Sequence, residues 1–210
     1  MSGTAIVDLG TGNLRSVARA LAHEVPGETP AITRDPAVIG RAARVVLPGQ
    51  GAIGTWMAAL ADADLRRAVD AALAGRPVLG ICLGLEALYS FSDEDGGVPC
   101  LGLLAGRVRR FTGADPGARK VPHMGWNRVR QSRPHPLWRG IEDGARFYFV
   151  HSYYAAAERD DEIFGRTDYG LTFTSAAGRG NFFAVQFHPE KSRAAGLRLL
   201  RNFSAWDGAR

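Results

Sequence analysis

Residues 77–89 read PVLGICLGLEALY, a mostly apolar run in which two glycines flank Cys82. The uninterrupted apolarity of Pro77–Ile81 predicts a strand that is buried on both faces, as in a parallel sheet. Glycines on either side of Cys82 let the chain turn sharply, so residues 80–84 form a cysteine version of the G-x-S-x-G elbow, which joins a strand to a helix. We expect a helical segment at Leu85–Tyr89, whose start lowers the pKa of the Cys82 thiol.

Strands and helices alternate on the N-terminal side of this elbow. This alternation predicts a parallel sheet with helices on both faces. The expected elements are a strand at Thr4–Asp8, a helix from Leu14 to Leu21, a strand at Ala43–Leu47 stopped by Pro48-Gly49, and a helix in two pieces between Ile53 and Leu73.

The C-terminal half has apolar runs separated by turns rather than by helices, which predicts antiparallel additions to the sheet. We therefore expect an α/β fold with a mixed, mostly parallel sheet in one domain over residues 1–210. The runs are Arg107–Phe111, Phe147–Val150, Ile163–Arg166, Leu171–Thr174 and Phe182–Phe187, followed by an amphipathic helix from Ser192 to Phe203.

A cysteine nucleophile needs a base, usually histidine, that a third group orients. The expected strand Phe182–Phe187 ends in His188-Pro189-Glu190, so His188 is the candidate base and Glu190 its orienting carboxylate. The other histidines are less well placed: His23 on the solvent face of a helix, His135 in a loop between prolines, and His123 and His151 near strands, where they are structural or line a site. Cys100 lies in a loop-like segment without flanking glycines at a strand-to-helix junction, so we interpret it as incidental.

Composition excludes several other classes. The chain has only two cysteines and no CxxC pair, which excludes a disulfide framework and a cysteine-rich zinc site, so we expect no metal and no cofactor. The net charge is +5, but only two of the 26 basic residues are lysine and the arginines are scattered, so we expect no nucleic-acid partner. Without a signal peptide or a spanning apolar segment, we expect a cytoplasmic protein with no membrane partner.

The motif GICLG at 80–84, together with HPE at 188–190, resembles the class I (triad) glutamine amidotransferases, which have a flavodoxin-like α/β fold. Further strings resemble one branch of that family, the glutaminase subunits of imidazole glycerol phosphate synthase in histidine biosynthesis, over nearly the whole chain. These strings are VDLGTGNLRSV at 7–17, LPGQGA at 47–52, KVPHMGWN at 120–127, FYFVHSYY at 147–154, VQFHPEKS at 185–192 and GLRLLRNF at 196–203.

The resemblance implies a role for each matching position. Cys82 would attack the side-chain amide of L-glutamine, and His188 would protonate the departing ammonia and then activate water. The oxyanion hole would use backbone N–H groups of Leu83 and of the Gly49-Gln50-Gly51 turn. The implied substrate-binding residues are Gly49, Gly51, Glu86, His151 and Ser152.

The resemblance also implies a partner, a (β/α)₈-barrel cyclase subunit that forms a heterodimer with the chain and receives ammonia through its interior. Glutaminase activity would stay low until this partner and its ligand bind, because the oxyanion N–H is not yet aimed correctly. The implied interface residues are Gly12, Asn13, Trp126, Tyr148 and Lys191.

Two positions depart from the family pattern. Glu86 stands where glutamine usually helps to hold the substrate, and as a carboxylate it would lose the amide donor and repel a substrate carboxylate. Gln50 stands where a small aliphatic residue is common, which we interpret as tolerated variation.

Four other functions compete with this interpretation. A dinucleotide-binding domain is suggested by Gly10-x-Gly12, but Arg15 replaces the third glycine and no acidic residue follows at the required distance. A different cysteine hydrolase would share the triad but not the strings at 120–127 and 147–154. A regulatory homologue without turnover would have lost the triad, which is intact here. A paralogue that supplies ammonia to a different barrel synthase stays open.

Overall fold

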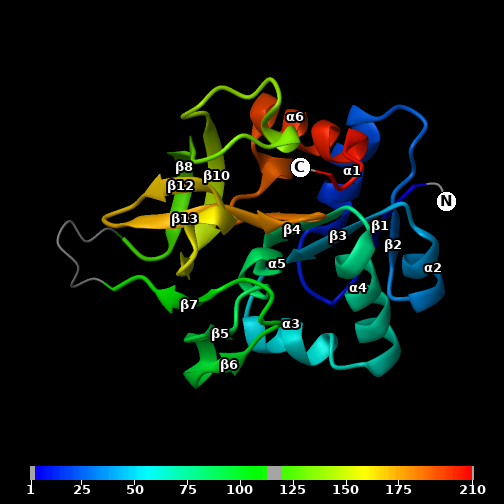
Figure 1. The fold of residues 1–210 in the computed structure, drawn as a ribbon, viewed down its shortest axis with the longest axis horizontal. Coiled ribbons are helices and arrows are strands. Elements are labelled where there is room, and N and C mark those ends of the chain that lie inside the picture. Colours follow the sequence, from blue (N-terminus) through cyan, green and yellow to red (C-terminus); the bar gives the residue numbers. More distant parts are fainter. Residues whose placement is uncertain (1–2, 113–119, 210) are drawn as a thin grey trace.

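The computed structural model describes residues 3–112 and 120–209, and a long mixed sheet runs through it (Figure 1). Its parallel part has the order β2-β1-β3-β4-β14, and all four pairings in this part are parallel. These strands are β1 (Thr4–Val7), β2 (Ala31–Thr33), β3 (Arg44–Gly49), β4 (Val78–Cys82) and β14 (Phe182–Val185). The elbow strand β4 is therefore central, as the sequence predicts.

The sheet continues beyond β14 with strands that pair antiparallel, apart from the parallel pairing of β5 with β7, and this confirms that the C-terminal half adds antiparallel strands. They are β13 (Thr172–Arg179), β11 (Tyr153–Ala157), β7 (Gly106–Arg110), β5 (Phe91–Ser92) and β6 (Val98–Pro99), with β12 (Ile163–Asp168) and β9 (Arg130–Gln131) alongside. A separate antiparallel pair is formed by β8 (His123–Arg128) and β10 (Arg146–His151). The run Phe147–Val150, which was expected to extend the main sheet, therefore lies outside it, because its strand pairs with β8 instead.

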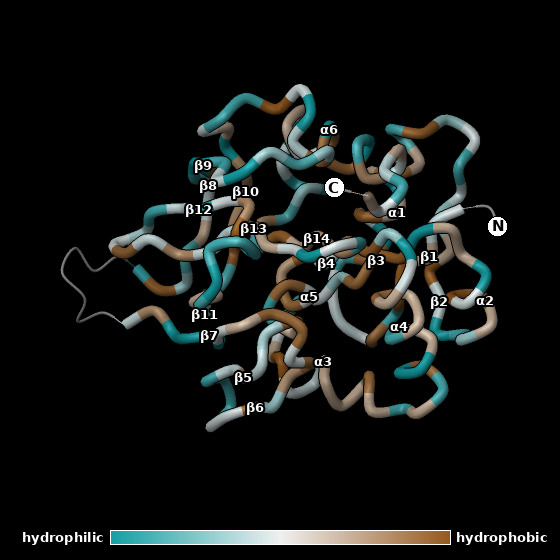
Figure 2. The backbone as a smooth tube through the Cα atoms, viewed as in Figure 1, coloured by the Kyte–Doolittle hydropathy of each residue, from teal (hydrophilic) through white to brown (hydrophobic). Residues whose placement is uncertain are grey.

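Helices cover both faces of the sheet. On one face α1 (Leu14–Glu24) packs against α6 (Arg193–Ala205), and on the other lie α2 (Pro36–Arg41), α3 (Ile53–Ala59) and α4 (Ala63–Gly75) (Figure 1). A hydrophobic core lies on each face of the sheet, and side chains of the central strands contribute to both. In β4, Val78 packs on the α4 side, whereas Leu79 and Ile81 pack on the α6 side. Figure 2 shows the apolar segments gathered around β3, β4 and the helix α5 (Leu83–Glu86).

Four short 3₁₀ turns complete the described elements: η1 (Glu94–Gly96), η2 (Pro136–Trp138), η3 (Asp160–Glu162) and η4 (Pro189–Lys191). Across residues 3–112 and 120–209, no helix is both long and apolar enough to cross a bilayer.

The structure also has the strands β5, β6, β8 and β9, which the sequence does not predict, and it differs from the expectations at β2 and α2, at the end of β3 and at the helix after the elbow. The edge strand β2 and the helix α2 are absent from the prediction, because elements of three and six residues carry too little periodicity. The strand β3 continues through Pro48-Gly49 instead of stopping there. At Pro48, β3 pairs with β4 but no longer with β1, which pairs with residues 44–46. Proline is tolerated there because its missing N–H would face the side of the strand that has no partner. The helix after the elbow spans Leu83–Glu86 rather than Leu85–Tyr89.

The elbow depends on a very close approach between α5 and β3. A Cβ atom on Gly84 would lie 1.9 Å from the backbone oxygen of Leu47, and one on Gly80 would lie 2.5 Å from the oxygen of Gly84. Both contacts are with backbone, which cannot move aside as a flexible side chain can. The two glycines of the motif are therefore required by packing as well as by the turn.

We expect Gly84→Ala to lower the free energy of unfolding by at least about 2 kcal/mol, because the added methyl group overpacks a backbone contact. Gly40→Ala is the matched control: Gly40 lies in α2, no atom of the described residues comes within 4 Å of its added Cβ, and alanine favours the helix. Urea unfolding of both variants measures the difference. Equal stabilities would contradict the close approach.

Candidate active site

Cys82 lies at the junction of β4 and α5 in a strained backbone conformation, with φ 56° and ψ −106°. A non-glycine residue with positive φ is costly and persists only where the surrounding structure imposes it. Such strain is expected at a nucleophile elbow, where the turn holds the side chain out at the carboxyl end of the sheet. The predicted sharp turn from strand to helix at Cys82 is therefore present.

His188 and Glu190 form the predicted hydrogen-bonded pair, with Nδ1 of His188 2.9 Å from Oε1 of Glu190. Their side chains are only 2% and 1% exposed. Because a carboxylate oxygen can only accept, Nδ1 carries a proton and Nε2 is left as a base in the neutral ring. In the part of the chain that the structure describes, Nε2 is buried with no hydrogen-bond partner, so it is not bonded to the Cys82 thiol.

Strand pairing brings the two halves of the site together. Val185 of β14 pairs in register with Ile81 of β4, which puts Gln186 beside Cys82 and His188 two residues further along. The amide nitrogen of Gln186 lies 3.9 Å from the Cys82 sulfur. The sequence analysis does not identify Gln186, because its proximity to Cys82 depends on the pairing of strands about a hundred residues apart.

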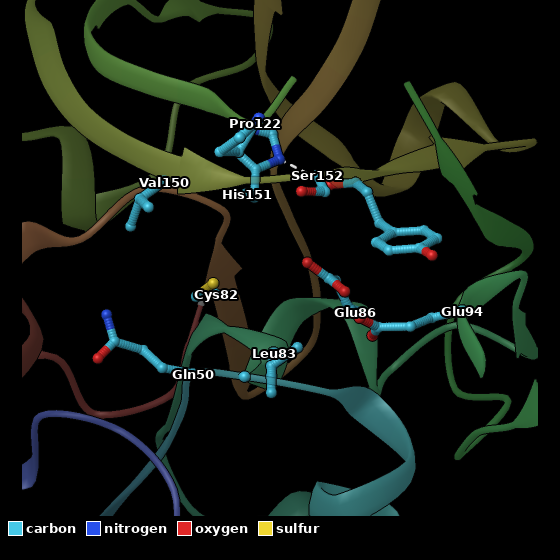
Figure 3. Close-up of a pocket in the computed structure, with 11 residues that line it drawn as sticks. Gln50, Cys82, Leu83, Glu86, Glu94, Pro122, Val150, His151 and Ser152 are labelled. Carbon is cyan, nitrogen blue, oxygen red and sulfur yellow. Dashed lines mark hydrogen bonds between the residues drawn. The ribbon is translucent and has the colours of Figure 1, made fainter. Parts of the chain in front are cut away.

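A cavity of about 270 Å³ opens beside Cys82 (Figure 3). Seven of the predicted site residues line it: Gln50, Gly51, Cys82, Leu83, Glu86, His151 and Ser152. Glu94, Pro122, Val150 and Tyr153 also line it and were not predicted. Gly49, His188 and Glu190 are not among the lining residues of the described chain, although Gly49 pairs with Cys82 across β3 and β4.

The Gly49-Gln50-Gly51 turn forms one side of the cavity and is packed from two directions. A Cβ on Gly49 would lie 2.6 Å from the Trp56 ring, and that ring donates from Nε1 to the Pro48 carbonyl at 3.0 Å. A Cβ on Gly12 would lie 3.5 Å from the backbone nitrogen of Gln50. The turn at residues 10–13 therefore abuts the turn that is predicted to supply an oxyanion N–H.

The expected lowering of the Cys82 thiol pKa is wrong. Burial raises the pKa of this thiol well above its usual value, and the neighbouring Glu86 raises it further, more than the backbone N–H of Leu83 lowers it. The helix that follows has only four residues, so its dipole is small, whereas burial and the nearby acids disfavour a thiolate. The free protein thus holds Cys82 as a thiol that needs a base.

Glu86 also differs from its expected state. The side chain is 2% exposed, and its Oε1 accepts a hydrogen bond from Nε2 of Gln186 at 2.7 Å. Burial raises the pKa of Glu86 to about 8, so the carboxyl is mostly protonated at neutral pH. The interpretation of Glu86 as a carboxylate is therefore corrected.

A pair of buried histidines supports the opposite wall of the cavity. Nδ1 of His151 lies 2.6 Å from the Tyr153 carbonyl and must donate to it, which leaves Nε2 to accept from Nδ1 of His123 at 2.8 Å. Burial lowers the pKa of His151 to about 3, so the ring is neutral. The two hydrogen bonds fix the tautomers of both rings and hold the segment 150–153 in place.

An acidic side chain completes the cavity. Glu94 lies beside Glu86 at the side away from Gln50 (Figure 3), and its Oε2 accepts from the backbone nitrogen of Ile53 at 2.8 Å. This bond ties η1 to the first residue of α3, just after the Gly51 turn. No group of three or more His, Cys, Asp or Glu side chains in the described residues could hold a metal ion.

The predicted interface residues Trp126, Tyr148 and Lys191 lie together on the surface, joined by Arg193. The Trp126 and Tyr148 ring centroids are 6.1 Å apart, Lys191 Nζ lies 5.9 Å from the centre of Tyr148, and the Arg193 guanidinium lies 5.3 Å from that of Trp126. Trp126 is 41% exposed, and nearby Met124 is 62% exposed. We call Trp126, Tyr148, Lys191 and Arg193 together the aromatic–basic surface. Gly12 and Asn13 are exposed in a separate turn before α1.

Comparison with known proteins gives consistent results. The family profile described as "Glutamine amidotransferase class-I" matches residues 5–205. The "Imidazole glycerol phosphate synthase subunit HisH" of Aromatoleum aromaticum is 54% identical over 211 residues, covering 98% of this chain and 99% of that protein. The protein of the same name from Methylococcus capsulatus is 52% identical over 212 residues, covering 99% and 98%.

Among solved structures, the crystal structure of a glutamine amidotransferase superposes with a TM-score of 0.70 at 19% identity, covering 97% of this chain and 98% of that one. This likeness supports the predicted fold class.

The raised thiol pKa predicts slow alkylation of Cys82 in the free protein. In a Cys100→Ser variant, the rate of reaction with iodoacetamide should rise about tenfold per pH unit and continue to rise above pH 9, because only the thiolate reacts. A Cys82→Ser variant reports Cys100 separately, whose pKa burial raises to about 11. A rate that levels off below pH 8 would show that Cys82 is already a thiolate.

Proposed function

The chain belongs to the class I glutamine amidotransferase family, and from this membership we propose that it is the glutaminase subunit of an imidazole glycerol phosphate synthase. In this role it hydrolyses L-glutamine and passes ammonia to a cyclase subunit in histidine biosynthesis. The observation that carries the proposal is the buried His188–Glu190 pair beside a strained Cys82 that opens into the cavity.

The reaction follows from the protonation states of the free site. His188 Nε2 takes the thiol proton of Cys82 as the sulfur bonds to the amide carbon of glutamine, and Glu190 stabilises the imidazolium that forms. That proton then passes to the leaving nitrogen, which departs as ammonia and leaves a glutamyl thioester. Water attacks the thioester while His188 again accepts a proton, and the returning proton releases glutamate and the Cys82 thiol.

The cavity supplies the remaining groups. The N–H of Leu83 follows Cys82 directly, and the Gly49–Gly51 turn brings a second donor to the same side, so both suit a negative oxygen on the former amide carbonyl. Glu94 at the far side suits the α-ammonium group of glutamine. His151 and Ser152 line the wall between these ends.

The cyclase partner is proposed to dock on the aromatic–basic surface and the 10–13 turn. The matched relatives are each named as a subunit, which supports an assembly with a second chain. Aromatic side chains with flanking cations are common anchors of protein interfaces. Because Gly12 packs against Gln50, a partner bound at the 10–13 turn can shift the proposed oxyanion turn and so raise glutaminase activity.

We expect the purified chain with its cyclase partner to release glutamate from glutamine, and Cys82→Ala to abolish this. Glu190→Gln should lower kcat by about a hundredfold or more with little change in KM, because the imidazolium loses its counter-charge. Cys100→Ala is the matched control and should retain turnover. Turnover that persists in Cys82→Ala would rule out the mechanism.

The histidine-pathway assignment predicts that the cognate cyclase, with its phosphoribosyl substrate, stimulates glutamate release. Trp126→Ala should weaken cyclase binding at least tenfold, about 1.4 kcal/mol by titration calorimetry. The control is Arg67→Ala, an exposed residue of α4 beyond the opposite face of the sheet. If this cyclase gives no stimulation but another barrel synthase does, the paralogue alternative is correct.

A further inference from the structure

The cavity wall next to Cys82 contains a buried acid, Glu86, for which the described residues supply no cationic partner. The structure records no ion pair for Glu86 within residues 3–112 and 120–209, and its hydrogen bond from Gln186 is with a neutral amide. The carbonyl oxygen of that amide, Oε1 of Gln186, is itself buried and without a partner among the described residues. An ionised Glu86 would therefore have only a neutral amide as donor among the described residues, while Oε1 of Gln186 stayed buried without a partner there, which is a costly arrangement.

Within residues 3–112 and 120–209, the groups around Glu86 do not offset a negative charge on its carboxyl. Glu94 and the Cys82 thiol lie close to Glu86, and a charge on Glu86 also raises the pKa of Cys100 and of Tyr153. Each of these groups is neutral or negative. Glu190 adds a further negative charge near Cys82, and His151, the histidine that lines the described part of the cavity, is neutral. The nearby cation Arg110 lowers the pKa of Tyr153, whereas the pKa of Glu86 is set by burial, Gln186 and Glu94.

We propose that Glu86 functions as a neutral carboxylic acid paired with Gln186, and that loss of its proton switches the glutaminase site off at alkaline pH. The proposal rests on the proposed function. A protonated Glu86 has a donor as well as acceptors, so together with Gln186 it can form the paired hydrogen bonds of an acid with an amide. This restores the donor that a carboxylate at this position would lack.

Deprotonation has two consequences, both in the same direction. A charge on Glu86 raises the pKa of the Cys82 thiol further, so that His188 must remove a more strongly held proton. The same charge stands beside Glu94 and repels any carboxylate group of the substrate in the cavity. The pKa of about 8 for Glu86 places this loss just above neutral pH.

The protonation state of Glu86 can be tested by a measurement that does not depend on enzyme activity. In an infrared titration of the chain, the difference between wild type and Glu86→Gln should contain the carbonyl band of a protonated carboxylic acid at pH 7. This band should disappear with a midpoint near pH 8. Glu94→Gln should shift the midpoint downward, because it removes a neighbouring acid that raises the pKa. A difference spectrum without this band at pH 7 would overturn the proposal.

The functional step is tested in the complex with the cyclase. The wild-type kcat/KM for glutamine should fall about tenfold per pH unit above pH 8, whereas Glu86→Gln should lack this loss. Groups that titrate in both enzymes, such as the substrate ammonium, cancel in the ratio of the two pH profiles. Identical profiles would overturn the switch even with the infrared band present. A wild-type complex without turnover at any pH would instead overturn the proposed function and the switch with it, while the infrared titration still decides the state of Glu86.

Discussion

The contact between Gly84 and the Leu47 carbonyl is the constraint on which the site depends. It brings α5 against β3 so closely that no side chain fits between them, and the chain can leave β4 only through the strained conformation of Cys82. The same approach sets Leu83 beside the Gly49–Gly51 turn, since Gly49 pairs with Cys82. The nucleophile and both proposed oxyanion donors are thus positioned by one packing contact between backbones.

The electrostatics of this site follow from the burial of its ionisable groups. Buried acids and a thiol share one small cavity, so each charge added there makes the others less stable. The resting state is therefore largely neutral, with Cys82 as a thiol, Glu86 as an acid and His151 as an unprotonated ring. The His188–Glu190 pair can stabilise a positive charge, because the Glu190 carboxyl accepts a hydrogen bond from the His188 ring. Neither residue is among those that line the cavity in the described chain.

The sequence predicts the features that are local to short motifs. The elbow glycines, Cys82, and the His188-Pro189-Glu190 turn are each identifiable because a few neighbouring residues determine them. Gln186 and Glu94 were missed, because their approach to Cys82 comes from strand pairing and from the bond between η1 and α3. The direction of the thiol pKa shift was wrong for the same reason: burial and distant acids outweigh a four-residue helix.

The turn η4 connects the catalytic pair to the proposed docking surface over three residues. Glu190 points inward to His188, whereas its neighbour Lys191 lies over Tyr148 on the outside. The backbone of Tyr148 in turn accepts from the N–H of His188, and Ser192 Oγ bridges the two by accepting from the N–H of Tyr148 and donating to the His188 carbonyl. A partner that contacts Lys191 and Tyr148 would therefore act on the segments whose backbone hydrogen bonds position His188. These hydrogen bonds connect the proposed docking surface to His188, in addition to the contact between the 10–13 turn and Gln50.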